Sequence, residues 1–554
     1  MFTAALHEAQ KCVRSAQYID VILSPQFLPS TYSITAISKE VLPKEPPEDL
    51  LEKHKIILLI NTCLSQVGRL SRQPTPILHT DNGEDNNEIT AILRIIFTAS
   101  KIIRPNGNLF LSDKLSNAEK QTALDRIRHI GELGLSSIFC LHSLLPEDHK
   151  NEFEDHIIIS LLAFTSASDP WTTKVSLDLA NRLLSIFRIE ILKQEFIMNS
   201  VLSSFIRPLF SSSKPKAITT SGYAAISSYT PREPYDFGAW NLTSKPWRLD
   251  NCYSLSILSW VVNQASQEVI LSVFHLLIPP ILILLDSPNA EMQFKGLKIL
   301  DAFVQKLTPK LLEQTGLGAV IEDAIHPILL YLPPITPLNE SLSLLPAAFN
   351  SFFVLLEVRF SSSTSNDIRR QDQAKQKLTS LTRLLRQAIA PAYNHTSMSS
   401  DSDPIIKKII LAQIPPLVRA LGVHSIAHLQ TLLQIAEDSL LDPFATASLP
   451  TMLAAIKALK EIVLCAWPRL SEERRRRELI RIMVSAWRKI YDDKNNSTEA
   501  FKKETLEELK SLGRIFVRAV ESSDDLDLSY DLNPLIHIDE TLKDLFGVRI
   551  DVNE

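Results

Sequence analysis

Residues 274–307 of this 554-residue chain read FHLLIPPILILLDSPNAEMQFKGLKILDAFVQKL and carry its clearest structural signal. Apolar residues recur three and four positions apart on both sides of the DSPN segment, which predicts two helices joined by a short turn. Pro279 and Pro280 lie inside the first helix, where a HEAT-type repeat places a bending proline. The stretch therefore predicts one helical-repeat unit.

Comparable units follow in the second half of the chain. Pro327 takes the place of the proline pair 47 residues after Pro280, within the roughly 40–47 residues usual for such repeats, and Pro415-Pro416 takes it later. Two helices that cannot bury their apolar faces alone must stack on neighbours. We therefore expect an all-α, HEAT-like helical-repeat α-solenoid with long interrupting loops. Its later units are expected at residues 321–360, 402–441 and 448–490.

Composition excludes several other classes of protein. Only 13 residues are glycine, about a third of the usual ~7%, which disfavours Rossmann-type nucleotide folds and hairpin-rich all-β folds. The net charge of −5 argues against a general nucleic-acid-binding protein. The five cysteines form no CxxC pair, so neither a zinc ribbon nor a disulfide framework is expected and a reducing compartment follows.

Two segments invite a membrane or targeting interpretation. The N-terminal MFTAALHEAQKCVRSAQ lacks the long apolar core of a secretory signal. Residues 269–285, VILSVFHLLIPPILILL, carry no acid, lysine or arginine, but they are shorter than the ~20 residues of a span and hold a proline pair. We expect a buried helix there, and no membrane as a partner.

Composition shifts suggest a division of the chain. Polar, proline-rich stretches predict surface loops at residues 24–49, 72–88, 361–373 and 394–403. The longest interruption holds six aromatic residues (Tyr223, Tyr229, Tyr235, Phe237, Trp240 and Trp247), so part of it should dock on the solenoid or on a partner. We predict an N-terminal helical region (1–210), this aromatic-containing loop (211–250), a C-terminal HEAT-like solenoid (251–520) and an acidic C-terminal segment (521–554).

Motifs for catalysis or metal binding are missing from the sequence. No HExxH, GxSxG or Walker-type loop occurs, and Cys140 and His142 lie two apart on a predicted helix, so they point to different faces. His275 and His326 sit among leucines and prolines, as hydrogen-bonded core histidines do. We therefore predict a protein that is not an enzyme and that uses no cofactor or metal.

Four further features have ordinary structural interpretations. Gly316 should cap the preceding helix in a left-handed conformation, and Glu322 and Asp323 read as acids favoured by a helix dipole in the first turn. The run Arg474–Arg477 is flanked by glutamates and predicts a salt-bridged, solvated face. Lys214 and Lys216 precede the loop aromatics, but the negative net charge favours protein docking over nucleic acid.

Three blocks of sequence resemble the Tel-two-interacting protein Two family. The first comprises 207–210 (RPLF), 214–219 (KPKAIT) and 222–226 (GYAAI), and the second comprises 276–280 (LLIPP), 284–286 (LLD) and 295–297 (KGL). The third is TGLGAVIEDAIHPILLYLPPITPLNESLSLLPAAF, residues 315–349. Together they cover about a third of the chain, from Asp169 to Phe360. Ile321 departs from the aromatic expected in the family, and the position reads as core.

The resemblance implies a non-catalytic scaffold, the smallest subunit of the TTT co-chaperone complex. Its partners would be the larger HEAT-repeat subunit and the telomere-maintenance subunit, with phosphatidylinositol-3-kinase-related kinases as clients and the heat-shock chaperone acting through its R2TP adaptor. We expect a cytoplasmic and nuclear protein. The residues expected to take part in partner binding are Arg207, Pro208, Lys214, Pro215, Gly222, Tyr223, Gly316, Gly318, Glu322 and Asp323.

The mechanism we expect is binding alone. The solenoid from about Leu255 to Val520 would hold the larger subunit, so truncation after Ser361 should abolish co-purification. Ser522 precedes acidic residues, a spacing that acid-directed kinases favour, so we expect that it could be phosphorylated.

Two rival functions stay open. One is a karyopherin-type transport receptor, although such chains are normally longer and more acidic. The other is an enzyme with its active site in the long loop, although this loop holds no histidine near its hydroxyls.

Overall fold

The computed structural model describes residues 1–15, 23–70, 85–110, 115–150, 153–211, 215, 217–225, 247–361, 367–398, 403–470, 472–492, 499–524 and 528–547. Within these ranges the secondary structure is helical, and extended pairing is limited to the isolated bridges Tyr32–Leu70 and Ile218–Ala224. The predicted all-α helical-repeat fold is confirmed. The chain forms two compact units, Met1–Leu284 and Leu285–Glu554.

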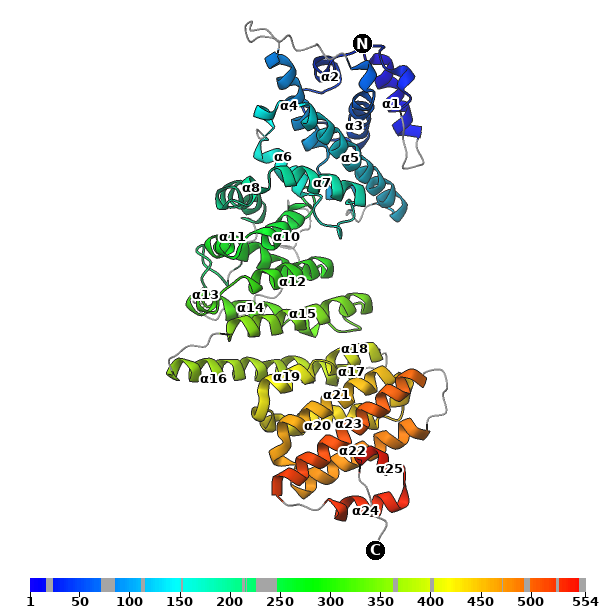
Figure 1. Ribbon diagram of the computed structural model, residues 1–554, viewed down its shortest axis with the longest axis vertical. Helices are drawn as coiled ribbons and strands as arrows, with labels where there is room; N and C mark the ends of the chain where they lie inside the picture. The colour runs from blue at the N-terminus through cyan, green and yellow to red at the C-terminus, as the bar shows by residue number, and fades with distance from the viewer. Residues whose placement is uncertain are drawn as a thin grey trace. The chain divides into compact units, whose positions relative to one another are not determined.

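The first unit contains the helices drawn from blue to green in Figure 1. Its longest members are α5, which spans 28 residues, and α11, which ends at the boundary between the units. A π-helical segment, Phe196–Ile206, leads directly into α9. The helices are α1 (Thr3–Ser15), α2 (Ile34–Glu40), α3 (Leu50–Ser65), α4 (Asp85–Ile102), α5 (Asn117–Leu144), α6 (Asp155–Leu162), α7 (Lys174–Ile186), α8 (Arg188–Ile191), α9 (Arg207–Phe210), α10 (Ser254–Gln264) and α11 (Gln267–Leu285).

The second unit contains the helices drawn from green to red. They are α12 (Ala290–Gln305), α13 (Pro309–Thr315), α14 (Leu317–Ile325), α15 (Leu338–Arg359), α16 (Asp367–Leu384), α17 (Ala390–Met398), α18 (Pro404–Leu411), α19 (Ile414–Leu421), α20 (Leu429–Leu441), α21 (Leu449–Ala466), α22 (Glu473–Asp492), α23 (Glu499–Asp524), α24 (Ser529–Ile538) and α25 (Leu542–Phe546).

Packing within each unit follows the pattern of a helical repeat. The most extensive contacts join helices that are separated in sequence by one or two others, such as α3 with α5, α12 with α15, and α21 with α23. Corresponding helices of successive repeats therefore stack on one another. Each repeat buries the apolar face that it could not bury alone, which is why the fold continues along the chain.

Helices of the second unit are enclosed on several sides. Four successive residues of α21, Leu453 to Ile456, are each at most 8% exposed. Because successive helical positions differ in direction by about 100°, such a run faces every side of the helix. The neighbours that cover α21 are α18, α19, α20 and α23. The wide apolar arcs of the sequence therefore correspond to helices buried between other helices.

Local sequence determines where the repeat helices begin and end. Asn289 accepts a hydrogen bond from the Met292 amide (3.0 Å) at the start of α12, and Thr308 accepts one from the Leu311 amide (3.3 Å) at the start of α13. Gly316 has φ of 70° and ends α13 in the left-handed conformation, as predicted. The turn between α13 and α14 is therefore one residue long.

The prolines of the predicted repeats do not all play one role. Pro279 and Pro280 lie inside α11, as expected. Pro327 instead follows the end of α14, and Pro415 and Pro416 lie in the first turn of α19, so the prediction that these prolines bend a helix is wrong. Proline lacks the amide that a helix interior needs but loses nothing in a first turn, where no such bond forms.

Several predicted loops contain helix. α2 lies within residues 24–49, where Ser33 caps it by accepting from the Ala36 amide (3.2 Å), so the prediction of a continuous loop is wrong. α16 begins at Asp367 and α17 continues to Met398, which shortens the predicted loops at 361–373 and 394–403. The predicted loop at 72–88 lies mostly outside the described residues, and α4 begins at Asp85.

The acidic C-terminal segment is also more structured than the sequence suggested. α23 continues to Asp524, so the predicted boundary after residue 520 falls inside a helix. Beyond it, α24 and α25 bury a set of apolar side chains, and Gly513 allows the Leu545 carbonyl to approach α23. The buried residues of these two helices are Leu532, Ile536, Leu542, Leu545 and Phe546. The segment therefore packs an apolar face against the rest of the second unit, with α25 against α23.

Three stretches meet the length and composition of a membrane span. They are Gln267–Leu285, Leu338–Arg359 and Pro404–Leu441, of which 56%, 56% and 39% respectively is buried in the structure. The third is divided among α18, α19 and α20 rather than forming one helix. For α11 the predicted buried character is seen in residues such as Ile270, Leu277 and Ile281, which are fully buried.

Candidate functional site

Residues 217–225, part of the first sequence block, fold into a small hairpin beside α11. The Ala225 amide donates to the Ala217 carbonyl (2.9 Å) and the Thr219 amide to the Tyr223 carbonyl (2.8 Å). The turn closes through the Gly222 amide and the Thr219 carbonyl (3.0 Å). The predicted residues Gly222 and Tyr223 thus lie on one turn, with Tyr223 47% exposed at its surface.

Gly222 lets this hairpin lie against the α11 backbone. Its φ is 78°, and a Cβ atom there would stand 2.9 Å from the His275 Cα and 3.0 Å from the Phe274 ring. Real Cβ atoms do not approach backbone atoms so closely, and a side chain in this conformation is strained as well. Glycine is therefore required at position 222 for two reasons, the left-handed conformation of the turn and the close contact with the α11 backbone.

The far end of the long loop is held by an aromatic stack. Trp247 is 1% exposed and lies parallel to Phe210 of α9, with the ring centroids 5.1 Å apart and the planes at 10°. A buried tryptophan contributes several kcal/mol of apolar burial. Part of the loop thus docks on the first unit, as expected. The other predicted aromatics, Tyr229, Tyr235, Phe237 and Trp240, lie outside the described residues.

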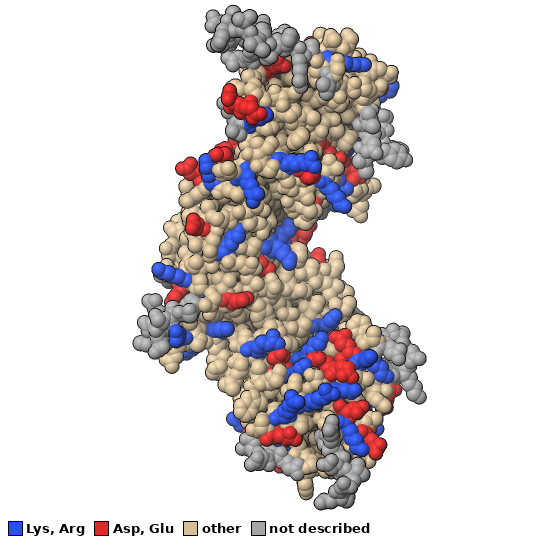
Figure 2. All heavy atoms as spheres, in the orientation of Figure 1, with Lys and Arg blue, Asp and Glu red and all other residues tan. Residues whose placement is uncertain are grey.

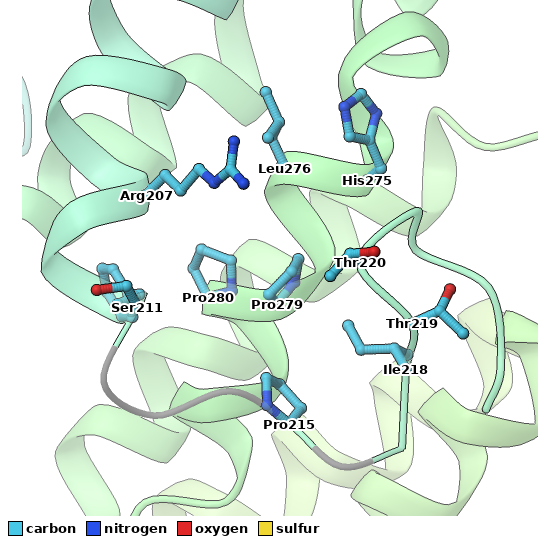
Figure 3. Close-up of a pocket in the computed structure, with 11 residues that line it drawn as sticks. Arg207, Ser211, Pro215, Ile218, Thr219, Thr220, His275, Leu276, Pro279 and Pro280 are labelled. Atoms are coloured by element: carbon cyan, nitrogen blue, oxygen red, sulfur yellow. The ribbon is translucent and has the colours of Figure 1, made fainter.

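Between the hairpin, α9 and α11 lies a pocket of about 310 Å³, shown in Figure 3. The Arg207 side chain extends across it from α9 toward α11. No hydrogen bond or ion pair involves this guanidinium among the described residues, and no acid lines the pocket. The lining residues are Arg207, Phe210, Ser211, Pro215, Ile218, Thr219, Thr220, His275, Leu276, Pro279 and Pro280. We call this site the Arg207 pocket.

Several of the predicted partner-binding residues thus lie close together in the folded chain. Arg207 and Pro215 line the Arg207 pocket, Gly222 shapes the hairpin beside it, and Pro208 is exposed on α9. Lys214 and Lys216 lie outside the described residues. His275, predicted as a core histidine, is half-buried and lines the pocket instead. Whether any of these residues contacts a partner stays a prediction.

The third sequence block forms a second arrangement, a buried carboxylate that joins three helices of the second unit. Glu322 of α14 is 4% exposed and accepts a hydrogen bond from the Ser380 hydroxyl of α16 (2.8 Å). Its carboxylate also pairs with Arg359 of α15 (3.3 Å) and Arg383 of α16 (3.6 Å). A buried carboxylate requires such partners because it has lost the solvation of water. We call this network the Glu322 joint.

Gly318 makes room for the Glu322 joint. A Cβ atom at this position would lie 2.8 Å from both Cδ and Nε of Arg359. The arginine therefore crosses directly over the α14 backbone to reach Glu322. The two glycines of the Gly316-Leu317-Gly318 sequence have separate roles, since one turns the chain and the other admits a side chain.

The first-turn interpretation of the adjacent acids is wrong. α14 begins at Leu317, so both acids lie beyond its first turn. Glu322 points into the fold, whereas Asp323 is 64% exposed in its side chain and binds Arg383 at 2.6 Å. Adjacent helical positions diverge by about 100°, which explains the two environments. Because Glu322 is buried, it cannot contact a partner directly and would affect partner binding only by holding α14, α15 and α16 together.

His326 is one turn after Glu322 and is buried, as predicted, at 7% exposure. Burial and, to a smaller extent, the positive charge of Arg383 together lower the pKa of His326 to about 4, against the opposing effect of Asp323. Its Nε2 atom has no hydrogen-bond partner among the described residues, so the prediction of a fully hydrogen-bonded histidine does not hold for this atom. The residue packs edge-on against Phe352, with centroids 6.0 Å apart.

Two more buried acids accept hydrogen bonds from side chains of another helix. Asp301 of α12 accepts hydrogen bonds from Asn350 (2.8 Å) and Ser351 of α15, and burial raises its pKa. In the first unit, Asp169 accepts a hydrogen bond from Ser256 of α10. Serine and asparagine side chains of a neighbouring helix thus satisfy acids that the packing of the chain removes from water.

Other candidates from the sequence have structural explanations. Cys140 is exposed while His142 is buried on the opposite side of α5. Arg475, Arg476 and Arg477 form ion pairs with Glu478 (2.8 Å), Asp531 (2.5 Å) and Glu473 (2.7 Å), as predicted. The Arg477 side chain is solvated, but those of Arg475 and Arg476 are 19% and 12% exposed, so the prediction of a solvated face is wrong for these two. No group of three or more potential metal ligands occurs within the described part of the chain.

Sequence reasoning missed Arg359, Ser380 and Arg383. Arg359 reads as an ordinary basic residue in the last turn of an apolar helix, and Ser380 and Arg383 lie on a polar helix rich in such residues. The spacing of three between Ser380 and Arg383 puts them on one face, which is the available signal. Nothing in the sequence indicates which acid they meet.

The fold, the Arg207 pocket and the Glu322 joint define a HEAT-like helical-repeat protein. The first sequence block docks a loop on α11, and the charged side chains of the Glu322 joint are paired with one another within the chain. A sequence model described as the Tti2 family matches residues 157–447, more than half of the chain. The chain belongs to the Tti2 family, as the sequence blocks predicted. Membership supports a role as a component of the TTT complex, with partner subunits.

Solved structures with a similar helical arrangement are karyopherins. Kap121p bound to Pho4p is 12% identical with a TM-score of 0.33, and the match covers 96% of this chain and 53% of that chain. Kap121p bound to RanGTP is 12% identical with a TM-score of 0.38, and the match covers 96% of this chain and 52% of that chain. The chain thus spans about half the length of these karyopherins. Likeness at this level carries no argument about function.

Proposed function

We propose that this chain is a non-catalytic scaffold subunit of the TTT complex. In this role its C-terminal solenoid, from about Leu255 to Val520, binds the larger HEAT-repeat subunit, and the complex includes the telomere-maintenance subunit. The assembly supports the maturation and stability of phosphatidylinositol-3-kinase-related kinases with the heat-shock chaperone and its R2TP adaptor. Family membership supports this proposal for the complex as a whole.

One structural observation carries the binding role of the second unit. Ile405, Phe444, Tyr491 and Phe501 are 49%, 80%, 53% and 47% exposed, although all four are large apolar or aromatic side chains. Exposed aromatic residues at inter-helix turns are typical anchors of protein interfaces. We call these four residues the apolar edge.

Hydrogen bonds tie the segments that bear the apolar edge to one another. Thr451, just after the turn that holds Phe444, donates to the Pro404 carbonyl beside Ile405 (2.9 Å). Lys489 donates to the Asp442 carbonyl (2.9 Å), which joins the end of α22 to the same turn. Lys502 donates to the Tyr491 carbonyl (3.4 Å) and joins α23 to α22. The four side chains therefore belong to neighbouring helix ends.

Part of the surface charge on the second unit is paired between helices of the chain itself. Lys460 pairs with Glu508 (2.9 Å) between α21 and α23, and Arg481 pairs with Glu437 between α22 and α20. Figure 2 shows blue and red side chains interleaved over this part of the molecule. A partner would gain little from charges already paired, so apolar contact is the stronger source of affinity here.

Full-length variants test this role better than truncation. Removal of everything after Ser361 would take away Ser380 and Arg383 and leave buried Glu322 with fewer partners, so the remainder would lose stability as well as surface. The variant Ile405→Glu with Phe444→Glu should instead reduce recovery of the larger subunit about tenfold or more in co-purification.

A matched control uses two exposed apolar residues of the first unit. Val175 and Ile189 are 54% and 80% exposed, and their double replacement by glutamate should leave recovery unchanged. Equal recovery with the apolar-edge variant and the control variant would contradict the placement of the interface. A thermal melt of each purified chain checks that both variants fold.

The cellular part of the proposal has its own measurement. Depletion of the chain should shorten the half-lives of several kinases of this class together, and the apolar-edge variant should fail to restore them while the first-unit control succeeds. Cell fractionation tests the proposed cytoplasmic and nuclear location.

Ser522 lies exposed on α23, and its hydroxyl donates to the Ala519 carbonyl (3.1 Å). Phosphorylation of Ser522 stays a prediction, which phosphopeptide mapping tests.

A further inference from the structure

We propose that the Arg207 pocket binds an acidic segment of a partner polypeptide. A side-chain carboxylate of that segment pairs with the Arg207 guanidinium, and an apolar side chain beside it packs against Pro279 and Pro280. This inference rests on the proposed function only in taking the chain to act by binding polypeptides. It concerns the first unit, whereas the interface with the larger subunit is assigned to the second.

Charge is the first argument. Arg207 is exposed, its guanidinium has no acceptor among the described residues, and no aspartate or glutamate lines the pocket. By contrast, Arg359, Arg383 and Arg476 of the second unit each bind a carboxylate of the chain itself. A planar guanidinium presents paired donors that match the two oxygens of a carboxylate. The pocket therefore lacks the acid that its arginine is suited to bind.

The shape and lining of the pocket indicate a side chain as the apolar part of the ligand. A volume of about 310 Å³ lies at the small end of ligand pockets, which run from roughly 300 to 1,000 Å³. Pro279, Pro280 and Leu276 of α11 form a continuous apolar wall, which Figure 3 shows below and above the Arg207 guanidinium. One apolar side chain beside the carboxylate fills such a space.

Hydroxyl groups complete the rim. Ser211 follows α9, and Thr219 and Thr220 belong to the hairpin turn, so the pocket has hydroxyls on two sides. The Ser211 hydroxyl already donates to the Pro208 carbonyl (2.8 Å), and the Thr219 hydroxyl oxygen accepts from the Tyr223 amide (3.2 Å). Ser211 can therefore still accept, and Thr219 can still donate, a hydrogen bond to the backbone of an extended peptide. A phosphate group is a poorer match, because phosphate sites usually gather several basic side chains, and Arg207 is the one arginine or lysine among the described lining residues.

The pocket is also held in place before any ligand arrives. Gly222 fixes the hairpin against the α11 backbone, and the stack of Trp247 on Phe210 fixes the end of α9. A preformed site loses little freedom on binding, so even a small contact area gives usable affinity. This combination of rigidity, one free positive charge and an apolar wall favours a short peptide motif.

A peptide library displayed on phage tests the proposal with the full-length chain as bait. We expect enriched peptides to share an aspartate or glutamate within about two residues of a leucine, isoleucine, phenylalanine or proline. In fluorescence polarisation the synthetic peptides, acetylated and amidated at their ends, should bind Arg207→Glu about tenfold or more weakly than the unchanged protein. Replacement of the peptide acid by its amide should give the same loss.

Two further variants complete the design. Arg188→Glu changes another exposed arginine of the first unit, on α8, and should bind the peptides normally. Thr220→Trp should block binding by filling the pocket without a change of charge. Enrichment of peptides that lack an acid, absence of enrichment, or equal binding to the Arg207 and Arg188 variants would overturn the proposal. Binding that needs a free peptide C-terminus would assign the carboxylate to a chain end and overturn it too.

The readout needs no TTT subunit. Failure of the larger subunit to co-purify would therefore count against the proposed function and leave the peptide result standing. Conversely, a chain that assembles normally but selects no acidic peptide refutes the Arg207 pocket alone.

Discussion

Replacement of Glu322 by glutamine tests whether the Glu322 joint locks three helices together. The substitution keeps the shape of the side chain and removes its charge, so Arg359 and Arg383 lose a buried counter-ion. The Ser380 hydroxyl keeps a possible acceptor in the amide oxygen. The measured effect should therefore report the ion pairs more than the serine bond.

The expected loss of stability follows from burial. Breaking a fully buried ion pair costs about 3–5 kcal/mol, whereas an exposed pair contributes about 0–1 kcal/mol. Glu322 is 6% exposed in its side chain, but Arg359 and Arg383 are 19% and 34% exposed and stay partly solvated. We expect an intermediate loss of about 2–3 kcal/mol. At about 2–4 °C for each kcal/mol in a unit of this size, the melting temperature should fall by roughly 5–10 °C.

The assay is thermal unfolding of the full-length chain, with hydrogen exchange to locate the change. Exchange should rise in α14, in the end of α15 and in α16, and it should stay unchanged in α21. Asp323→Asn is the matched control, because Asp323 binds Arg383 at 2.6 Å but is 64% exposed, and its loss should cost less than about 1 kcal/mol. Equal melting temperatures for the two variants would refute the idea that burial gives Glu322 its effect.

Three further predictions concern single residues. Gly222→Ala should destabilise the hairpin by about 2 kcal/mol, because its Cβ would stand 2.9 Å from the His275 backbone, and limited proteolysis should then cut the loop faster than in the unchanged chain. His326 stays neutral in the folded chain down to about pH 4, whereas the unfolded chain binds a proton near pH 6.5. The free energy of unfolding should therefore fall as the pH drops from 6.5 to 4, by about 2 kcal/mol at pH 5. In denaturant titrations, His326→Gln should show a flatter dependence of stability on pH. Gly513→Ala should release α25, because its Cβ would stand 2.2 Å from the Leu545 carbonyl oxygen, and unchanged exchange in α25 would contradict this.

Helix-forming patterns made most of the fold predictable. The 3.6-residue periodicity, the scarcity of glycine and the cap residues are local properties, so the all-α repeat class and the left-handed Gly316 could be read without knowledge of distant contacts. Loops were less predictable. α2 was missed because it spans seven residues between prolines, a length at which propensity is weak and packing decides.

The charged sites depended on contacts between distant residues. Glu322 and Asp323 are adjacent in sequence, yet one is buried and the other exposed, because helices α15 and α16 happen to cover one side of α14. Likewise, Arg207 and Pro280 are 73 positions apart and face one pocket only because the hairpin docks on α11. Local sequence sets which residues are helical and which are charged. The stacking of repeats determines which charged side chains lose water and need partners, and it leaves Arg207 exposed, with no partner in the described parts of the chain.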